Sequence, residues 1–261
     1  MNTLGPFLAD RIATVSQFAR PARPLLPVAK RTHVIHSPFE FPPSPDRDAA
    51  RAELLDEIGA GEAPLLLGYF GALVPRKRPL DFVRAVAATA KALPDRDVRG
   101  LLFGLAILPN KPLDHDAKAL AEDLGIGDQI HLMGFRNPIA GPMAAMDTML
   151  VPAENEPFGR TLIETMHLGT PVIATRHGGN IEAIEDGVTG RLVPLGDPEA
   201  MAGAVIQLER DPDLRARIVA AARSGLEERY GTARHVRLIS ALYEDLVPAH
   251  RRRGDLRPAL A

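Results

Sequence analysis

The stretch that decides the fold reads EPFGRTLIE over residues 156–164, followed by LGTPVIAT over residues 168–175. Its two carboxylates, Glu156 and Glu164, stand eight residues apart around a predicted helix start. Because Pro157 suits the first position of a helix, we expect Glu156 at the mouth of this helix and Glu164 two turns along it. Glycine and an apolar strand follow, an order typical of α/β folds.

These residue types fit a ligand that has both hydroxyl and phosphate groups. Carboxylates accept hydrogen bonds from sugar or ribose hydroxyls, and the free N–H groups at a helix start attract phosphate. In the next turn, RHGGN at residues 176–180, the glycines would let a second backbone segment approach the ligand. His177 and Asn180 could reach a phosphate or an acceptor, although turns favour asparagine and glycine anyway. Glu164 has a plainer alternative, an exposed pair with Arg160.

Short apolar runs alternate with segments of helical periodicity along most of the chain. Such runs, bounded by turn residues, are typical of buried parallel strands. Two Asp-Pro pairs, at residues 197–198 and 211–212, are helix-start signals. The pattern predicts an α/β fold, a Rossmann-like parallel sheet with helices on both faces. Strands are expected at residues 65–70, 98–103, 130–133, 148–151, 171–174 and 190–193, and helices at residues 79–92, 114–124, 138–146, 158–168 and 232–246.

Composition excludes several classes of protein. The 261 residues include 31 basic and 33 acidic side chains, a net charge of -2, which gives no reason to expect nucleic acid as a partner. Without cysteine there is no disulfide, thiolate catalysis or cysteine-based zinc site. We find no apolar run long enough for a transmembrane helix and no secretory signal pattern. A soluble, cytoplasmic protein is therefore expected.

Four motifs stand in close order: NEPFGR at residues 155–160 with Glu164, GTPVIA at residues 169–174, the double glycine at residues 178–179, and EAIEDGVTGRLVP at residues 182–194. Together they resemble the donor-site signature of the retaining glycosyltransferases of family four, also called group one. The similarity runs from about residue 65 to residue 246 and reaches weakly back to residues 10–16. It implies a GT-B fold, in which two Rossmann-like domains face a cleft and the C-terminal one holds the nucleotide sugar.

The chain resembles the C-terminal half of such a protein, preceded by the last segment of an N-terminal half. We expect residues 1–47 to be a remnant of the N-terminal domain and a proline-rich linker, residues 48–231 the nucleotide-sugar-binding domain, and residues 232–261 a C-terminal helix with a basic tail. In this family the missing half contributes much of the acceptor site. Either the gene product is truncated, or a second polypeptide supplies a separate N-terminal-domain chain.

The resemblance implies transfer of a sugar from a nucleotide-diphosphate donor, most commonly UDP or GDP, to a carbohydrate or lipid-linked hydroxyl acceptor with retention. The family's usual setting, polysaccharide or lipid-linked glycan synthesis, places it in the cytoplasm with at most peripheral contact at the inner membrane face. No cofactor or protein nucleophile is expected, because the leaving phosphate assists the acceptor. The alternative is a non-catalytic nucleotide-sugar-binding module or a subunit of a split enzyme. A Rossmann oxidoreductase is disfavoured, since GIG at residues 125–127 lacks the third glycine of the dinucleotide fingerprint.

By this resemblance, Glu164 takes the ribose hydroxyls and Glu156 faces the transferred sugar. Backbone N–H groups of the segment between them are expected to receive the sugar or the diphosphate. The expected substrate-binding positions of that segment are Phe158, Gly159 and Arg160.

The loop at residues 71–78 matches the family's glycine-basic loop, which holds the diphosphate. Its Gly71 and Lys77 fit the pattern, whereas Ala72 stands where an arginine is usual, and Arg76 is a candidate to compensate. Fixed cations here would stabilise the negative charge of the leaving group without a metal. The plainer alternative is a solvated basic turn.

Two further turns complete the predicted site. Gly134 and Phe135 end a strand at the edge where ligands lie in open α/β sheets, and family members bind the nucleotide base there. Gly178 and Gly179 are also expected to contact the substrate.

No metal site is expected. Three Asp-x-Asp triplets, at residues 46–48, 95–97 and 114–116, fit the metal motif of the other glycosyltransferase architecture, but the motif is short and common. His33 and His36 have ligand-like spacing with Glu40 as the one nearby carboxylate in sequence, so we expect them to be structural.

Overall fold

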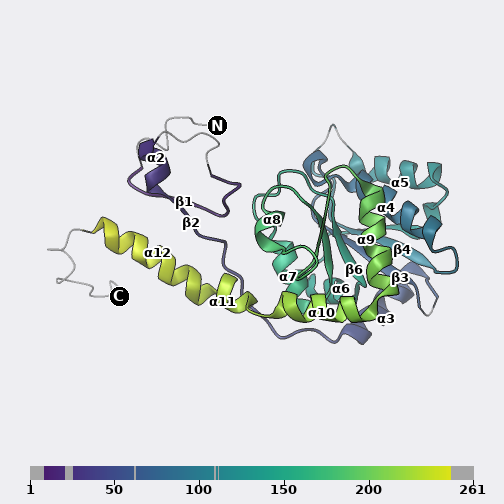
Figure 1. Cartoon of the computed structure of the whole chain (residues 1–261). Coiled ribbons are helices and arrows are strands. Elements are labelled where there is room, and N and C mark those ends of the chain that lie inside the picture. The colour runs from purple at the N-terminus through teal and green to yellow at the C-terminus, as the bar shows by residue number, and fades with distance from the viewer. Residues whose placement is uncertain (1–8, 21–25, 62, 109, 111, 248–261) are drawn as a thin grey trace, which may run out of the picture.

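The computed structural model describes residues 9–20, 26–61, 63–108, 110 and 112–247. Most of them form a six-stranded parallel sheet in the order β5-β4-β3-β6-β7-β8, with helices on both faces (Figure 1). The predicted α/β Rossmann-like fold is confirmed. The strands are β3 (Leu65–Phe70), β4 (Val98–Phe103), β5 (Ile130–Gly134), β6 (Thr148–Val151), β7 (Val172–Thr175) and β8 (Arg191–Val193).

Each face of the sheet has its own hydrophobic core and its own helices. One core contains residues of α3, α6 and α7, and the other contains residues of α4, α5 and α9. Every residue of β3 is buried, because its side chains pack into both cores. The helices of this domain are α3 (Arg47–Ile58), α4 (Pro79–Ala92), α5 (Leu113–Asp123), α6 (Ala140–Ala145), α7 (Arg160–Leu168), α8 (Asn180–Ala183), α9 (Pro198–Arg210) and α10 (Pro212–Arg223), with short 3-10 turns at Pro75–Lys77 and Gly127–Gln129.

The strand order changes direction between β3 and β6. The chain adds β4 and β5 on one side of β3, and then β6, β7 and β8 on the other. In open parallel sheets the loops that follow two such central strands lead to opposite faces of the sheet, and a crevice forms between them at the carboxyl edge. These loops span residues 71–78 and 152–159, so the fold itself brings the predicted basic loop toward Glu156.

The start of α7 differs from the prediction. The helix expected from residue 158 begins at Arg160, because Gly159 at its N-cap has a left-handed backbone with φ of 74° and cannot continue a right-handed helix. Pro157 is therefore not the first helical residue. Glu156 lies in the loop before the helix rather than at its mouth.

Helix α3 was not predicted, and it accounts for the first Asp-x-Asp triplet. Oδ1 of Asp46 accepts hydrogen bonds from the N–H groups of Asp48 and Ala49, each at 3.0 Å. Asp46 is thus an N-cap, which satisfies donors that the first helical turn leaves without partners. The triplet has a structural explanation.

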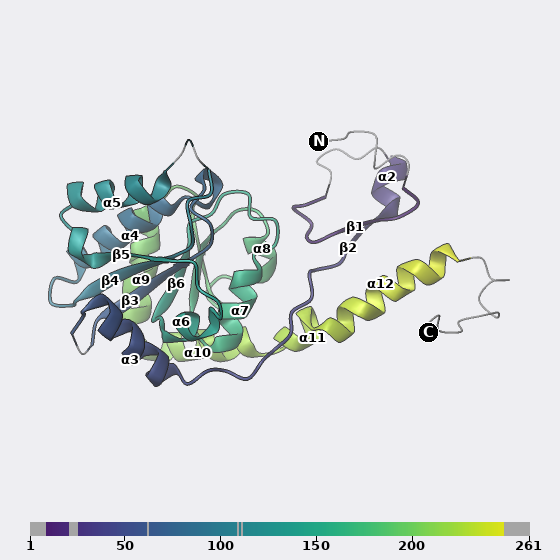
Figure 2. The same ribbon diagram turned by 180° about the vertical axis from the view of Figure 1, so that it is seen from behind.

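A smaller unit lies beside the six-stranded domain. Its strands β1 (Ile12–Thr14) and β2 (Thr32–Val34) pair in parallel, and α2 (Leu26–Arg31) precedes β2. Helices α11 (Leu226–Tyr230) and α12 (Thr232–Leu246) lead the chain back to this unit (Figures 1 and 2). There Arg11 forms an ion pair with Asp245.

The chain crosses between the two units twice, and the two crossings touch each other. Phe39 forms a β-bridge with Gly231, and the N–H of Phe39 donates to the carbonyl of Tyr230 at 2.9 Å. Close by, Nδ1 of His235 lies 2.9 Å from the carbonyl oxygen of His36. Residues near both ends of the described chain therefore meet at one junction.

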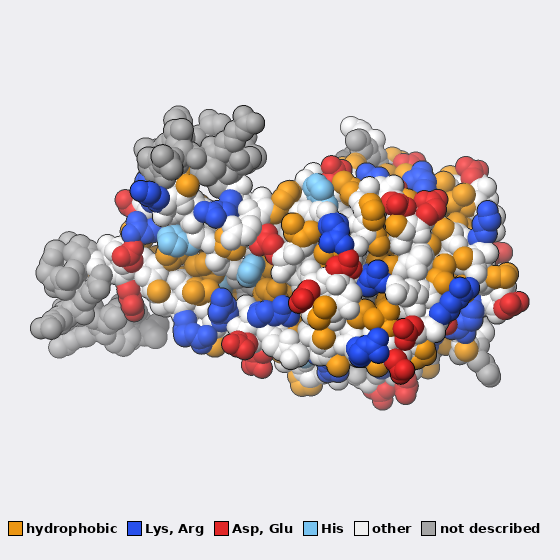
Figure 3. Space-filling view, viewed as in Figure 1, with side chains coloured by type: hydrophobic (Ala, Val, Ile, Leu, Met, Phe, Trp, Pro, Cys, Tyr) orange, Lys and Arg blue, Asp and Glu red, His pale blue; other side chains and the backbone are white. Residues whose placement is uncertain are grey.

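None of the described helices combines the length and the apolar character needed to cross a bilayer. The basic tail predicted beyond residue 247 lies outside the described residues. On the described part of the surface seen in Figure 3, basic and acidic side chains are interspersed, in keeping with a net charge of -2.

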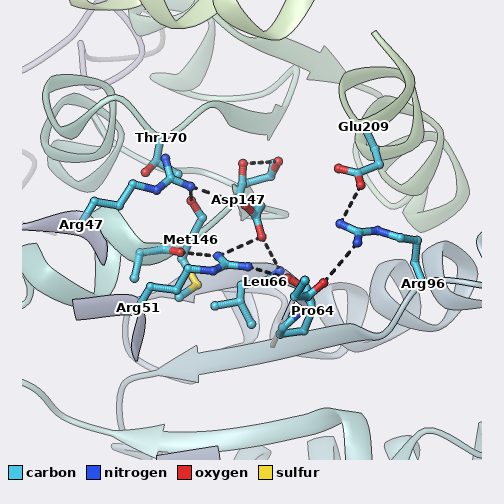
Figure 4. A network of polar contacts seen from close by, with 12 residues as sticks. Arg47, Arg51, Pro64, Leu66, Arg96, Met146, Asp147, Thr170 and Glu209 are labelled. Atoms are coloured by element: carbon cyan, nitrogen blue, oxygen red, sulfur yellow. Dashed lines mark hydrogen bonds and ion pairs between the residues drawn. The ribbon is translucent and has the colours of Figure 1, made fainter. Parts of the chain in front are cut away.

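At the amino edge of the sheet, Asp147 holds three arginines, of which Figure 4 labels Arg47 and Arg51. Its carboxylate lies 3.4 Å from Arg47, 3.1 Å from Arg51 and 3.5 Å from Arg215. It also accepts the N–H of Leu66 at 2.8 Å. Burial lowers the pKa of Arg47, and the charge of Asp147 opposes that shift. This residue therefore ties α3 and α10 to the sheet.

Replacing Asp147 by alanine should destabilise the fold by about 3 kcal/mol, because three cations and one N–H would lose their shared partner. Urea denaturation measures the change in the free energy of unfolding. Asp123→Asn, an exposed substitution on α5, is the control and should stay within about 0.5 kcal/mol. An Asp147 variant as stable as this control would show that the arginines do not depend on the carboxylate.

Candidate active site

Glu156 and one backbone hydrogen bond join the loops after β3 and β6. Oε2 of Glu156 lies 3.4 Å from Nζ of Lys77 and 3.4 Å from a guanidinium nitrogen of Arg76. The N–H of Glu154 donates to the carbonyl of Arg76 at 2.6 Å. The side chain of Glu156 is only 12% exposed, so two neighbouring cations offset a largely buried charge. The three residues predicted as catalytic meet at one point.

Gly71 lets Lys77 fold over the backbone of its own loop. A Cβ at position 71 would lie 2.9 Å from Nζ of Lys77 and 3.0 Å from its Cδ. Any residue larger than glycine at this position would therefore displace the lysine side chain. The N–H of Gly71 donates to the carbonyl of Phe103 at 2.9 Å. Tyr69 donates its hydroxyl to the carbonyl of Ala72 at 3.0 Å, and burial raises the pKa of Tyr69, which keeps this donor protonated. The basic loop is therefore fixed in place.

A cavity of about 320 Å³ opens beside this loop. Its lining is mostly apolar. Phe70 and Phe103 stack with their ring centroids 4.8 Å apart, and Phe135, which also lines the cavity, is 72% exposed. A concave, largely apolar surface with few polar groups suits a flat ring such as a nucleobase.

Glu164 connects the cavity to the basic loop. It lines the cavity together with Gly71, over which Lys77 lies. Its side chain is 21% exposed and sits 3.6 Å from Arg160. Burial raises the pKa of Glu164, and the nearby charge of Arg160 partly opposes this. The plainer alternative, a pair with Arg160, is thus present, and the same residue also lines the cavity.

The loop after β5 forms another wall of the cavity. Gly134 has φ of 67°, and a Cβ there would meet nothing within 4 Å, so backbone conformation rather than space favours glycine. Its carbonyl accepts the N–H of Gly104 at 2.8 Å. Phe135 and Arg136 line the cavity, and Arg136 forms an ion pair with Glu57. Contact of this loop with a base stays a prediction.

The segment before α7 offers its backbone rather than its side chains. Phe158 is buried and stacks on His36 with ring centroids 4.8 Å apart. A Cβ on Gly159 would lie 2.6 Å from Cδ1 of Leu162. Arg160 points outward, with its side chain 62% exposed. The predicted contacts of these residues with a ligand can therefore use the N–H groups, and Phe158 cannot use its ring.

The turn after β7 packs against the loop of Glu156. A Cβ on Gly178 would lie 2.7 Å from the carbonyl oxygen of Glu156, and one on Gly179 would lie 2.6 Å from that of Pro157. Both glycines are buried and are needed for this close approach of two backbones. Their contact with a substrate stays a prediction.

The idea that Asn180 could reach a ligand is wrong. Asn180 is fully buried, and its Nδ2 donates to the carbonyl of Thr175 at 3.1 Å. It thereby ties the start of α8 to the end of β7. His177 is half-buried, and its Nδ1 accepts the N–H of Asn155 at 3.1 Å.

Glu182 is a residue that sequence reasoning missed. Its carboxylate accepts the N–H groups of Gln17 at 2.8 Å and Phe18 at 3.0 Å, and lies 3.6 Å from Nε2 of His36. His36 thus has structural partners in Glu182 and in the ring of Phe158, although its carboxylate partner is distant in sequence. No local signal reveals this contact, because 165 residues separate Gln17 from Glu182.

Among the described residues, no three His, Cys, Asp or Glu side chains are grouped so as to hold a metal ion. Asp97 of the second Asp-x-Asp triplet pairs with Arg99 at 2.6 Å. Asp114 and Asp116 of the third lie in the first turn of α5, where negative charge is favourable.

The decisive comparison is with protein families. The family described as glycosyl transferases group 1 matches residues 50–225, which include both loops and α7. The chain belongs to this family. Its similarity to the inositol phosphate glycosyltransferase of Corynebacterium glutamicum (strain R), named D-inositol 3-phosphate glycosyltransferase, is 35% identity over 177 residues, 67% of this chain and 42% of that protein. For N-acetyl-alpha-D-glucosaminyl L-malate synthase of Bacillus anthracis the identity is 31%, over 75% of this chain and 49% of that one.

Solved structures agree with this glycosyltransferase fold. HepE of Anabaena, determined in complex with UDP-glucose, superposes with a TM-score of 0.76 and 26% identity over 91% of this chain and 64% of that one. The C-terminal domain of LpcC, a group 1 glycosyltransferase from Francisella tularensis, gives a TM-score of 0.64 and 25% identity over 74% of this chain and 96% of that domain. The chain spans about half the length of the relatives it matches.

Glu164→Gln should make the fold more stable at neutral pH. Because burial raises the folded pKa of Glu164 above its ordinary value of 4.5, the stability it contributes is fully present below that value and is lost as pH rises through the folded pKa. Glutamine has no such loss. Thermal unfolding from about pH 4 to pH 8 should give similar midpoints at the acid end and a higher midpoint for the variant at the neutral end, with exposed Glu53→Gln as control. If the unfolding midpoint of the wild-type protein instead rose relative to that of the variant as pH increases, the assigned burial cost would be contradicted.

Proposed function

We propose that this glycosyltransferase chain binds a nucleotide-diphosphate sugar in the crevice between the loops after β3 and β6, for transfer to a hydroxyl acceptor with retention. The observation that supports this most is the arrangement of Lys77, Glu156 and Glu164. Lys77 lies 3.4 Å from Glu156, and Glu164 lines the neighbouring apolar cavity together with Gly71, over which the lysine lies. Residues 48–231 would form the donor-binding domain.

Each residue has a role that follows from its charge. Lys77 and Arg76 would bind the diphosphate, where negative charge increases as the leaving group departs. A diphosphate that binds these cations competes with Glu156 for them. The freed carboxylate can then accept a hydrogen bond from a sugar hydroxyl, while Glu164 accepts from the ribose hydroxyls. The leaving phosphate would assist the acceptor, so this scheme needs no protein nucleophile.

UDP or GDP sugars are the proposed donors, and a carbohydrate or lipid-linked hydroxyl the proposed acceptor. HepE was solved with UDP-glucose, and the cavity of about 320 Å³ can house one base. A cytoplasmic location, with at most peripheral contact at the inner face of a membrane, suits this donor and acceptor.

A second candidate is a nucleotide-sugar-binding module, or one subunit of a split enzyme. The chain spans between 42% and 52% of the relatives compared, and this part contains the loops to which the donor contacts are assigned. Under this alternative the chain binds the donor and turns it over only when a separate N-terminal-domain chain supplies the acceptor side.

Lys77→Ala should weaken binding of UDP-glucose or GDP-mannose by roughly 10- to 100-fold, because a charge-assisted contact to the diphosphate is lost. Isothermal titration of the full chain measures the affinity. Lys91→Ala, an exposed lysine on α4, is the matched control and should stay within about twofold. A native chain that binds neither donor would overturn the proposed function, and binding without turnover would favour the second candidate.

Donor binding should be unchanged when divalent metal is removed, because Lys77 and Arg76 provide the cations for the diphosphate. The titration is repeated in EDTA and in magnesium. Affinity lost in EDTA and restored by magnesium would contradict the assignment of this role to the two side chains.

A further inference from the structure

The turn at residues 176–180 holds the backbone of Asn155 and Glu156 at two points. At the first, Nδ1 of His177 accepts the N–H of Asn155 at 3.1 Å. At the second, the N–H of Gly179 donates to the carbonyl of Glu156 at 2.7 Å. Gly178 fits between these contacts, since a Cβ there would lie 2.9 Å from the backbone nitrogen of Glu156. The position of Glu156 is therefore set by this turn.

The hydrogen bond from Asn155 fixes an unusual backbone. Asn155 has φ of 55°, in the left-handed region that asparagine tolerates better than most residues. Its side chain is exposed, so packing of that side chain does little to hold this conformation. The hydrogen bond to His177 orients the peptide between Glu154 and Asn155, directly before the left-handed residue that leads into Glu156.

This contact determines the tautomer of His177. A backbone N–H can only donate, so Nδ1 must present its lone pair, and the proton of the neutral imidazole lies on Nε2. The ring is also packed from outside the turn, where Phe18 meets it edge-on with centroids 5.9 Å apart. Phe18 is itself held through its N–H by Glu182 at 3.0 Å.

We propose that His177 is a positioning residue for the donor site. Through Nδ1 it holds the left-handed turn at Asn155 and thereby places Glu156 against Lys77 and the donor sugar. This inference rests on the proposed function in one respect only, namely that the ligand in contact with Glu156 is a nucleotide sugar. Residue 177 would then influence binding of the sugar more than binding of the nucleotide, because the ribose contact is assigned to Glu164.

The test uses two substitutions that differ in where they place an acceptor. In His177→Asn the amide oxygen of the new side chain lies near the position of Nδ1 and can accept the N–H of Asn155. In His177→Gln the amide oxygen of the longer side chain lies nearer the position of Nε2. Titrations of the full chain with UDP-glucose and with UDP compare them (GDP-mannose and GDP, if the native chain selects guanine). His115→Gln, an exposed histidine on α5, is the matched control.

The glutamine variant should lose roughly three- to tenfold in affinity for UDP-glucose, the effect of one hydrogen bond, and change by less than about twofold for UDP. The asparagine variant should regain most of the lost affinity. Equal losses in both variants, or losses of equal size for UDP and UDP-glucose, would overturn the proposal. A fold that is merely weakened would lose affinity for both ligands alike.

A second measurement needs no ligand, and so separates this inference from the proposed function. Nitrogen NMR of the native chain should show His177 protonated on Nε2, with a coupling across the hydrogen bond from the Asn155 amide to Nδ1. The amide resonance of Glu156 should shift in His177→Gln and return toward its native position in His177→Asn. A proton on Nδ1 would refute the contact whatever the protein binds, whereas a native chain that binds no donor yet shows this signature would refute only the proposed function.

Discussion

The contact of Glu156 with Lys77 and Arg76 is the constraint on which the rest of the site depends. The parallel sheet brings the loops after β3 and β6 to one edge, but strands alone do not fix two loops against each other. A mostly buried carboxylate needs cations nearby, and the basic loop supplies two at 3.4 Å. The same cations suit a diphosphate, so the interaction that orders the site is also one that a charged ligand can replace.

Close backbone contact is the second requirement, and glycine meets it. Gly71 leaves room for the lysine chain, and Gly178 and Gly179 let the turn after β7 lie directly on the loop of Glu156. These glycines of the sequence thus have a packing reason that is independent of any ligand. The positions of these glycines are explained by contact between segments of the protein, before any contact with a ligand is considered.

The sequence predicted regular elements well because their signals are local. The strand at residues 65–70 and the helices at residues 79–92 and 232–246 have the predicted limits, since apolar periodicity and proline at the helix start are properties of neighbouring residues. The meeting of Glu156 with Lys77 was expected through family resemblance and is present at 3.4 Å, whereas a ligand site shared with Glu164 stays a prediction. What failed depended on backbone conformation or distant partners: the left-handed Gly159 shortened α7, and Glu182 meets Gln17 across 165 residues.

The β-bridge between Phe39 and Gly231 has a mechanical consequence. Both connections between the two units pass through this one point, joined by a hydrogen bond of 2.9 Å from Phe39 to Tyr230. A second hydrogen bond, from His235 to the carbonyl of His36, holds the same two connections side by side. Separating the smaller unit from the six-stranded domain would therefore strain both connections at one place, and would also have to release Gln17 and Phe18 from Glu182.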